Sequence, residues 1–282
     1  MMALFIKTIT NMKTKNGLFL WMACLLAVSC GQQTGSSDVT TQELAYSYKD
    51  GKIEIELNIE YPNGGNELLK QAVREYISET LGGEYKGSLE EGQGMIDFYG
   101  EQIKSSLLKE YEEEKQNLAE ENINGFTTKM DLKKDYETDK LVTFIVTQEF
   151  YLNGAHGTAT SFGMTFRKSD GRRFLPNMMV NVHSDGMYAI LKEGLREYFS
   201  QMEGKPLDNA ALQEYILTDD NIESLPMPQY PPFVTKDGIS FIYQQYEISF
   251  YAAGMPSFMV GFDKIKPFLS KPALDMLDMT EE

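Results

Sequence analysis

Apolar and polar residues alternate strictly from Ile53 to Tyr61. A period of two residues is typical of a β-strand with one buried face and one solvated face. Residues 126–136, 141–151 and 162–166 are predicted to be further strands on the same pattern. The segment Pro62-Asn63-Gly64-Gly65 is expected to end the first strand.

Three other segments carry apolar residues at steps of three and four, which predicts amphipathic helices. These segments cover residues 66–81, 94–119 and 185–202. Asn66 is a favourable N-cap for the first helix, and Gly82-Gly83 is expected to end it. The charged far end of the second helix is interpreted as a solvated face.

Two Asp-Gly pairs, Asp170-Gly171 and Asp237-Gly238, predict hairpin turns. The proline-rich residues 225–233 between them can form neither a helix nor a central strand. Residues 246–254 follow, and then a short strand over 257–262. The chain is expected to close with a helix capped by Asp263, with Ile265, Phe268 and Leu269 facing inward.

Strands and helices interleave along the chain, yet both hairpin signals are antiparallel ones. The pattern therefore predicts an α+β fold, in which amphipathic helices pack on one or more antiparallel sheets. The expected organisation divides the folded part into an N-terminal half, residues 45–172, and a C-terminal half, residues 173–282.

Residues 17–29 are apolar but too few to cross a bilayer comfortably, so residues 1–29 are interpreted as a secretory signal peptide. Lys13 and Lys15 supply its positive flank, and Met12 is an alternative start to Met1. The run Ala27-Val28-Ser29-Cys30-Gly31 resembles the lipobox of bacterial lipoproteins. It predicts cleavage before Cys30 and lipidation of that cysteine. The alternative is an ordinary signal peptide in which Cys30 is incidental.

The polar residues 30–44 after the predicted lipidation site have the composition of a flexible tether. Acyl chains on Cys30 would hold the protein on a membrane. The sequence resembles lipoproteins of Bacteroidetes, in which acidic residues after the cysteine often mark display on the outer face. Gln32 and Gln33 stand there instead, which favours a periplasm-facing protein and leaves surface display open.

The chain is acidic, with 42 Asp and Glu against 26 Lys and Arg. Loss of residues 1–29 would remove three lysines and no acids, so the net charge would fall from −16 to −19. Such a charge repels nucleic acid, which we exclude as a partner, and attracts cationic partners. Solubility of an exported protein explains the same acidity equally well.

The sequence carries no recognisable catalytic or metal motif. His156 and His183 are its only histidines, and neither has a second ligand at the spacing of zinc enzymes. We therefore predict no cofactor, no metal site and no catalytic residues, and a protein that is not an enzyme.

One local feature stands out, where the run Tyr151-Leu152-Asn153-Gly154-Ala155-His156-Gly157 joins two predicted strands. Glycines on both sides of His156 indicate a tight backbone path. One hypothesis is that His156 projects into a ligand surface. The alternative is a turn in which the imidazole bonds nearby backbone and holds the shape of the loop.

Several motifs together resemble the extracytoplasmic domain of RsiV-type anti-sigma factors. They are Tyr151 with Gly154–Gly157, then Asp170-Gly171, Asp237-Gly238 and the block Tyr246–Gly254. The same domain pair accompanies PdaC-type peptidoglycan deacetylases and occurs in many lipoproteins of unknown function. The resemblance spans about residues 53–269 and implies a PdaC-like N-terminal half and an RsiV-like C-terminal half. Asn153 departs from the family pattern, which has glycine there, and Ser249-Phe250 replace Ala-Pro.

The resemblance implies that the protein binds a component of the cell envelope. In the anti-sigma factors that component is lysozyme, and peptidoglycan is the candidate for the deacetylases. We expect this chain to capture lysozyme or a similar cationic wall-lytic protein. The alternatives are a peptidoglycan-binding or accessory module, and an enzyme with an unrecognised site at His156. The expected binding residues are Asn153, Gly154, His156, Tyr246 and Tyr251.

Overall fold

The computed structural model describes residues 38–118, 123–217 and 222–280. The predicted signal peptide and the lipidation site at Cys30 lie outside the described residues. Among the described helices, none combines the length and apolar character that a membrane span requires.

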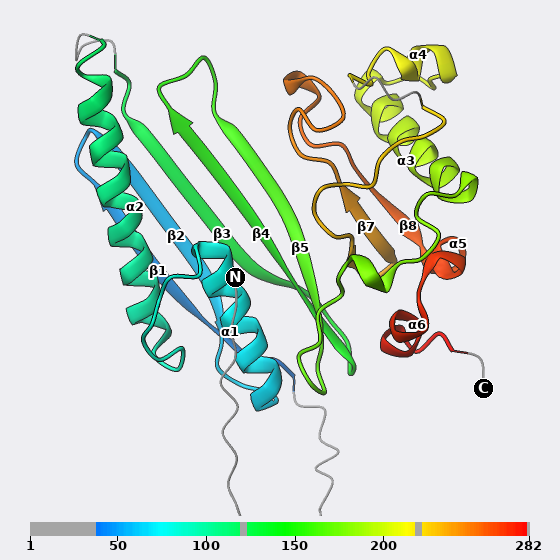
Figure 1. The fold of residues 1–282 in the computed structure, drawn as a ribbon, viewed down its shortest axis with the longest axis horizontal. Coiled ribbons are helices and arrows are strands. Elements are labelled where there is room, and N and C mark those ends of the chain that lie inside the picture. Colours follow the sequence, from blue (N-terminus) through cyan, green and yellow to red (C-terminus); the bar gives the residue numbers. More distant parts are fainter. Residues whose placement is uncertain (1–37, 119–122, 218–221, 281–282) are drawn as a thin grey trace, which may run out of the picture. The chain divides into compact units, whose positions relative to one another are not determined.

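The larger sheet has five strands in the order in which they occur along the chain (Figure 1). They are β1 (Thr41–Lys49), β2 (Ile53–Pro62), β3 (Phe126–Glu137), β4 (Leu141–Leu152) and β5 (Thr158–Arg167). Neighbouring strands are antiparallel except for β2 and β3, which are parallel. A parallel pair needs a crossover connection, and the chain between β2 and β3 supplies one that contains two helices.

Strand β1 was missed in the sequence pattern, and residues 41–44 were wrongly assigned to the tether. The physical reason is its position at the sheet edge. Its inward residues Leu44, Tyr46 and Tyr48 alternate with exposed ones but are only partly buried, so the pattern is short and weaker than in β2. In β2 the inward side chains of Ile53, Ile55, Leu57 and Ile59 are at most 2% exposed.

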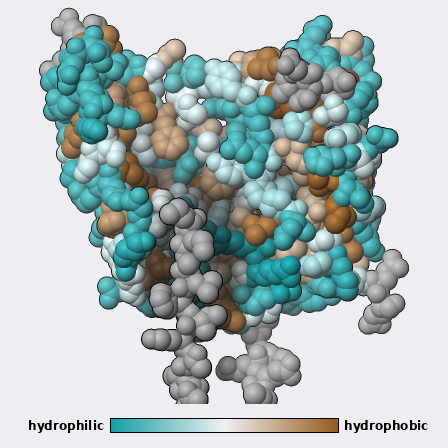
Figure 2. All heavy atoms as spheres, viewed as in Figure 1, coloured by the Kyte–Doolittle hydropathy of each residue, from teal (hydrophilic) through white to brown (hydrophobic). Residues whose placement is uncertain are grey.

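Helices α1 (Glu67–Leu81) and α2 (Gly92–Glu114) contribute buried residues to the same core as this sheet. As predicted, the Asn66 side chain accepts a hydrogen bond from the Leu68 N–H, and Gly82 ends α1 with a φ of 130°. Helix α2 begins two residues earlier and ends five residues earlier than the apolar spacing predicted. Hydrophilic side chains cover the outer side of α2 (Figure 2).

The smaller sheet is antiparallel and consists of β6 (Phe233–Val234), β7 (Gly238–Ile242) and β8 (Ser257–Gly261). Helix α3 (Asp185–Glu203) packs on it so closely that a Cβ atom at Gly194 would lie 2.2 Å from the Phe258 ring. Both Asp-Gly turns are present: one joins β6 to β7, and the other follows β5, where Gly171 has a φ of 72°. The predicted α+β class is confirmed.

The remaining elements are short: η2 (Pro176–Met178), α4 (Asn209–Gln213), η3 (Tyr251–Ala253), α5 (Phe262–Ile265), η4 (Lys266–Phe268) and α6 (Lys271–Leu277). The prediction of a single closing helix was wrong. Pro267 and Pro272 each stand in the first turn of a new element, because proline lacks the N–H that would continue a helix. Phe268 is consequently only half-buried.

A buried hydrogen-bond network links the two sheets. The Thr143 hydroxyl donates to the Val234 carbonyl at 2.8 Å, and the Val234 N–H donates to the Thr165 hydroxyl at 2.9 Å. The two hydroxyl oxygens lie 2.8 Å apart, so Thr165 donates to Thr143. All three residues are at most 1% exposed, and every polar group in the network has a partner.

Candidate functional site

The loop that joins β4 to β5 carries three of the predicted binding residues. Asn153 has a φ of 59°, a left-handed conformation that asparagine tolerates better than most residues. Its side-chain oxygen accepts a hydrogen bond from the Asn124 N–H at 3.0 Å. The left-handed backbone explains why asparagine can stand where the resembling family has glycine.

The two glycines of this loop differ. A Cβ atom at Gly157 would lie 3.0 Å from the Phe150 carbonyl oxygen, so the close backbone path predicted around His156 is real at that position. Gly154 is exposed, and its nearest neighbour to a Cβ atom would be the His156 carbonyl oxygen at 3.6 Å. Gly154 is therefore not required by packing.

The second segment, residues 244–251, lies about ninety residues further along the chain and meets this loop. The Tyr246 hydroxyl lies 3.2 Å from Nε2 of His156, and the Tyr251 ring stacks on the imidazole at a centroid distance of 3.7 Å. The rings of Tyr246 and Tyr251 are 5.7 Å apart. The structure thus brings His156, Tyr246 and Tyr251 together, as a small aromatic cluster.

The hydrogen bonds of the cluster favour one tautomer of the His156 ring. Nδ1 of the imidazole lies 2.9 Å from the Gly157 carbonyl oxygen, which can only accept, so Nδ1 carries the proton and donates. In the neutral ring Nε2 is then an acceptor for the Tyr246 hydroxyl. The Tyr251 hydroxyl also donates to the Gly157 carbonyl, at 2.9 Å.

These contacts divide the cluster into two roles. His156 and Tyr251 both hold the Gly157 carbonyl, so they fix the shape of the loop, as one of the two hypotheses for His156 required. Tyr246 is 58% exposed and has a φ of 63°, which costs backbone energy for a side chain of this size. Tyr246 is therefore the member of the cluster that is best placed to contact a ligand.

Sequence reasoning missed Gln244 and Gln245, which attach the second segment to β5. The Gln244 side chain accepts from the Ser161 N–H at 3.0 Å and donates to the Ser161 carbonyl at 2.9 Å. The Gln245 side chain accepts from the Ala159 N–H at 2.8 Å. Gln244 is buried, and a buried amide needs such partners. No short-range pattern connects these glutamines to a strand more than eighty residues away.

Glu247 holds the backbone of the turn at Gln244. Its carboxylate accepts from the Gln244 N–H at 2.6 Å and from the Gln229 N–H at 2.5 Å. Burial raises the pKa of Glu247, and these two hydrogen bonds oppose the rise. The carboxylate thus joins the proline-rich connection to the turn that carries Tyr246.

The described residues contain no group of three or more His, Cys, Asp or Glu side chains arranged to hold a metal ion. His183 precedes α3, away from the cluster contacts given above.

Residues 181–263 match DUF3298, a family described as a protein of unknown function. The match begins before α3, ends in α5 and includes Tyr246 and Tyr251, whereas the loop with His156 lies outside it. DUF3298 is the domain associated with RsiV and PdaC, so the predicted resemblance is supported at the level of this domain. No curated protein matches the chain.

Two solved structures share the fold. A member of the DUF3298 family from Bacteroides fragilis is 16% identical, with a TM-score of 0.67, over 87% of this chain and 100% of the other. A DUF3298 family protein from Pseudomonas aeruginosa is 14% identical, with a TM-score of 0.54, over 84% and 97% of the two chains. At these identities the likeness concerns the fold alone.

Proposed function

We propose that this protein is a binding module of the cell envelope that captures lysozyme or a similar cationic wall-lytic protein. The observation that carries the proposal is the meeting of the His156 loop with the Tyr246 turn at an exposed surface. Two segments far apart in sequence are held together there, and the result is a presented tyrosine ring.

The chemistry of this surface suits a cationic ligand. The face of a tyrosine ring attracts lysine and arginine side chains. The chain as a whole has a net charge of −16, which accelerates the encounter with a positively charged protein at low salt. Asn153 and Gly154 lie on the same loop as His156 and would form the neighbouring part of the surface.

The proposal is tested with the full-length protein, purified in detergent, by calorimetric titration with hen lysozyme at low salt. We expect binding that weakens about fivefold in Tyr246→Ala, because one cation–π contact contributes about 1 kcal/mol. Tyr48→Ala is the matched control, since that tyrosine lies on β1 and its loss should leave the affinity unchanged.

Absence of heat and of any inhibition of lysozyme by the wild-type protein would contradict the proposed function. Equal weakening in Tyr246→Ala and Tyr48→Ala would contradict the assignment of the surface. Thermal unfolding of each variant shows whether the fold is retained.

Peptidoglycan is a second candidate ligand, and the composition of the surface favours it. The Asn124 side chain donates to the Tyr151 hydroxyl at 3.3 Å, and the Asn124 N–H donates to Asn153 in the His156 loop, so amide and aromatic groups lie together there. Oriented polar groups beside aromatic rings are typical of small-ligand sites. Cosedimentation with purified sacculi distinguishes this candidate, because the acidic surface gives no general reason for such binding.

The proposed anchor is a lipid on Cys30, and the proposed role is non-catalytic. Incorporation of labelled palmitate that disappears in Cys30→Ala would support the anchor. A hydrolytic activity that is lost in a folded His156→Ala variant would contradict the non-catalytic role.

A further inference from the structure

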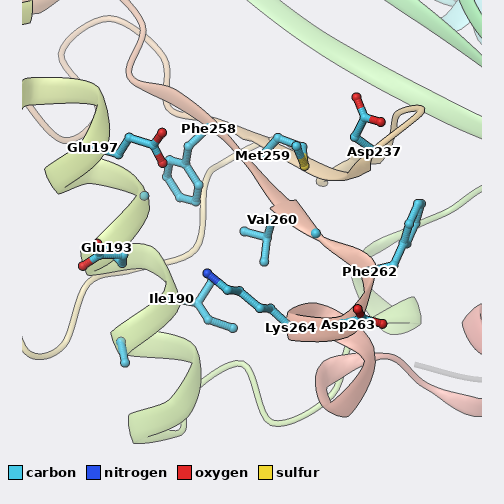
Figure 3. A pocket seen from close by; sticks show the side chains of 13 residues that line it. Ile190, Glu193, Glu197, Asp237, Phe258, Met259, Val260, Phe262, Asp263 and Lys264 are labelled. Carbon is cyan, nitrogen blue, oxygen red and sulfur yellow. The ribbon is translucent and has the colours of Figure 1, made fainter. Parts of the chain in front are cut away.

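A groove of about 820 Å³ runs between helix α3 and strand β8 (Figure 3). Residues 258–261 of β8 line it on one side, and Ile190, Glu193 and Glu197 line it from α3. The apolar side chains of Phe258, Met259 and Val260 lie in this lining. The groove contains none of the residues of the aromatic cluster around His156.

Strand β8 is an edge strand, because β7 is its neighbour in the sheet order β6-β7-β8. The direction of its backbone groups follows from the ladder. The Thr235 N–H donates to the Gly238 carbonyl. The backbone N–H and C=O groups of residues 238, 240 and 242 of β7 therefore point toward β6. The Tyr243 N–H donates to the Pro256 carbonyl. The backbone groups of residues 239 and 241 of β7 therefore point toward β8.

The register then fixes which groups of β8 point away from the sheet. Phe258 and Val260 stand opposite Phe241 and Ile239 and use their backbone groups in the ladder. Ser257, Met259 and Gly261 alternate with them and direct their N–H groups outward. Among the described residues, no hydrogen bond to these three N–H groups is present. An unpaired edge of this kind is a template for another strand.

The charge around the groove selects the kind of strand. Four acidic residues, Glu193, Glu197, Asp237 and Asp263, line the groove against a single base, Lys264. Arg196 pairs with Glu193 and neutralises part of this charge. The remaining excess is negative, which disfavours a second copy of this acidic chain and favours a basic segment.

We propose that the groove between α3 and β8 binds an extended basic segment of another protein, which adds to β8 as a fourth strand of the smaller sheet. Main-chain hydrogen bonds to Met259 and Gly261 would supply affinity, and lysine or arginine side chains facing Glu193 and Glu197 would supply specificity. This surface is separate from the one at Tyr246, so the inference does not depend on the proposed function.

The probe is an acetylated synthetic peptide of alternating lysine and valine, long enough to pair with all of β8. A peptide of alternating lysine and proline has the same charge spacing but lacks half of the N–H groups that a strand needs. Binding to the full-length protein is measured by fluorescence anisotropy, and hydrogen exchange reports on the amides of Met259 and Gly261. We expect the lysine-valine peptide to bind at least about tenfold more tightly and to protect both amides.

A variant pair isolates the strand edge. Gly261 has a φ of −59°, which proline adopts without strain, and a Cβ atom there would have no neighbour closer than 3.9 Å. Gly261→Pro therefore removes one outward N–H and no ladder bond, whereas Gly261→Ala keeps that N–H. We expect the affinity of Gly261→Pro for the lysine-valine peptide to be about tenfold lower than that of Gly261→Ala.

A second pair isolates the charge. Glu193→Gln combined with Glu197→Gln should lower the affinity for the lysine-valine peptide about fivefold and reduce the salt dependence of binding. Glu110→Gln with Glu114→Gln makes the same change at the same spacing on α2 and should leave the affinity within about twofold.

Three results would overturn the inference: equal affinity for both peptides, unprotected amides at Met259 and Gly261, or equal binding by Gly261→Pro and Gly261→Ala. Self-association of the protein that is abolished by Gly261→Pro would also overturn it, because β8 would then pair with a second copy. Circular dichroism establishes that each variant is folded.

Discussion

Strands β5 and β8 are both edge strands, so each has a row of backbone N–H and C=O groups without a neighbouring strand. Within the described part of the chain, these groups are satisfied in part in β5 but not in β8. In β5 the outward backbone groups of Ala159 and Ser161, and just before it the carbonyl of Gly157, are bonded by side chains of residues 244–251. Further along, Phe174 and Arg172 bond the backbone of Thr165 and Arg167. Along β8, the described residues leave the outward N–H groups without such partners.

The difference shows that side chains can satisfy part of an edge strand where no neighbouring strand does. Gln244 offers an acceptor and a donor on one planar amide, so it satisfies both backbone groups of Ser161 as a neighbouring strand would. Strand β5 is thus protected against pairing with another chain, whereas β8 keeps that capacity. Stability and binding are therefore expected to depend on different edges.

The largest effect is expected from Gln244→Ala, which would uncover β5. The change leaves the N–H and the C=O of Ser161 without partners in a region where Gln244 is 6% exposed. Two orphaned groups predict a loss of about 3 kcal/mol in the free energy of unfolding. Urea denaturation followed by circular dichroism measures the loss, and a value below about 1 kcal/mol would break the comparison.

Glu137→Gln tests the far end of β5, where Lys168 donates to the Glu137 carboxylate at 2.7 Å. Lys134 donates to the same carboxylate at 2.8 Å. Because the variant leaves the nearly buried Lys168 without its counter-charge, we expect a loss of about 2 kcal/mol at neutral pH. Arg196→Gln, at an exposed ion pair on α3, is the control and should cost less than about 1 kcal/mol.

The Glu137 contribution should also depend on pH. Burial raises the pKa of Glu137, but the hydrogen bonds from Lys134 and Lys168 outweigh this effect and hold the pKa below its usual value. The folded protein therefore binds this proton less tightly than the unfolded chain. The stabilisation is complete above the usual glutamate pKa of about 4.3 and is lost as the pH falls through the folded-state pKa. The stability difference between wild type and Glu137→Gln should shrink over that range.

Gln245→Ala should have a smaller effect than Gln244→Ala, of about 1 kcal/mol. Gln245 makes a single bond to β5, to the Ala159 N–H, and is only partly buried, so water can replace the amide. The same urea experiment provides the ranking. Equal losses of unfolding free energy in the two glutamine variants would show that burial does not decide how much each side chain stabilises the edge of β5.

The smallest effect is expected at β8, where Gly261→Pro and Gly261→Ala should differ by no more than about 0.5 kcal/mol in the free energy of unfolding. Neither change removes a bond of the described structure, because the Gly261 N–H points outward. A loss of several kcal/mol in the proline variant alone, measured by thermal unfolding, would show that this edge is not open.

The sequence pattern predicted those elements whose apolar residues must face a core. Strand β2 and helix α1 are examples, since their buried positions repeat with the period of the element and Asn66 caps the helix. It failed at β1, an edge strand whose alternating residues are only partly buried, and at the closing helix, where two prolines divide the segment. It also gave no sign that β2 and β3 are parallel.

The candidate site was predictable only where its residues carry a local sequence signal. His156 was prominent because glycines flank it, and Tyr246 and Tyr251 were predicted from the family pattern that the sequence resembles. The glutamines between Tyr243 and Tyr246 carry no local signal, since their partners are backbone groups of a distant strand. The groove beside β8 depends on which edge stays unpaired, and that is a property of the assembled sheet.

The threonine network that joins Thr143 and Thr165 to Val234 has a consequence for the evolution of this chain. Thr143 and Thr165 belong to the predicted N-terminal half and Val234 to the predicted C-terminal half, so the network joins the two by buried hydrogen bonds. A half exchanged with that of a relative must therefore bring matching hydroxyl and carbonyl positions. The two halves are expected to be inherited together, as a pair and not as interchangeable modules.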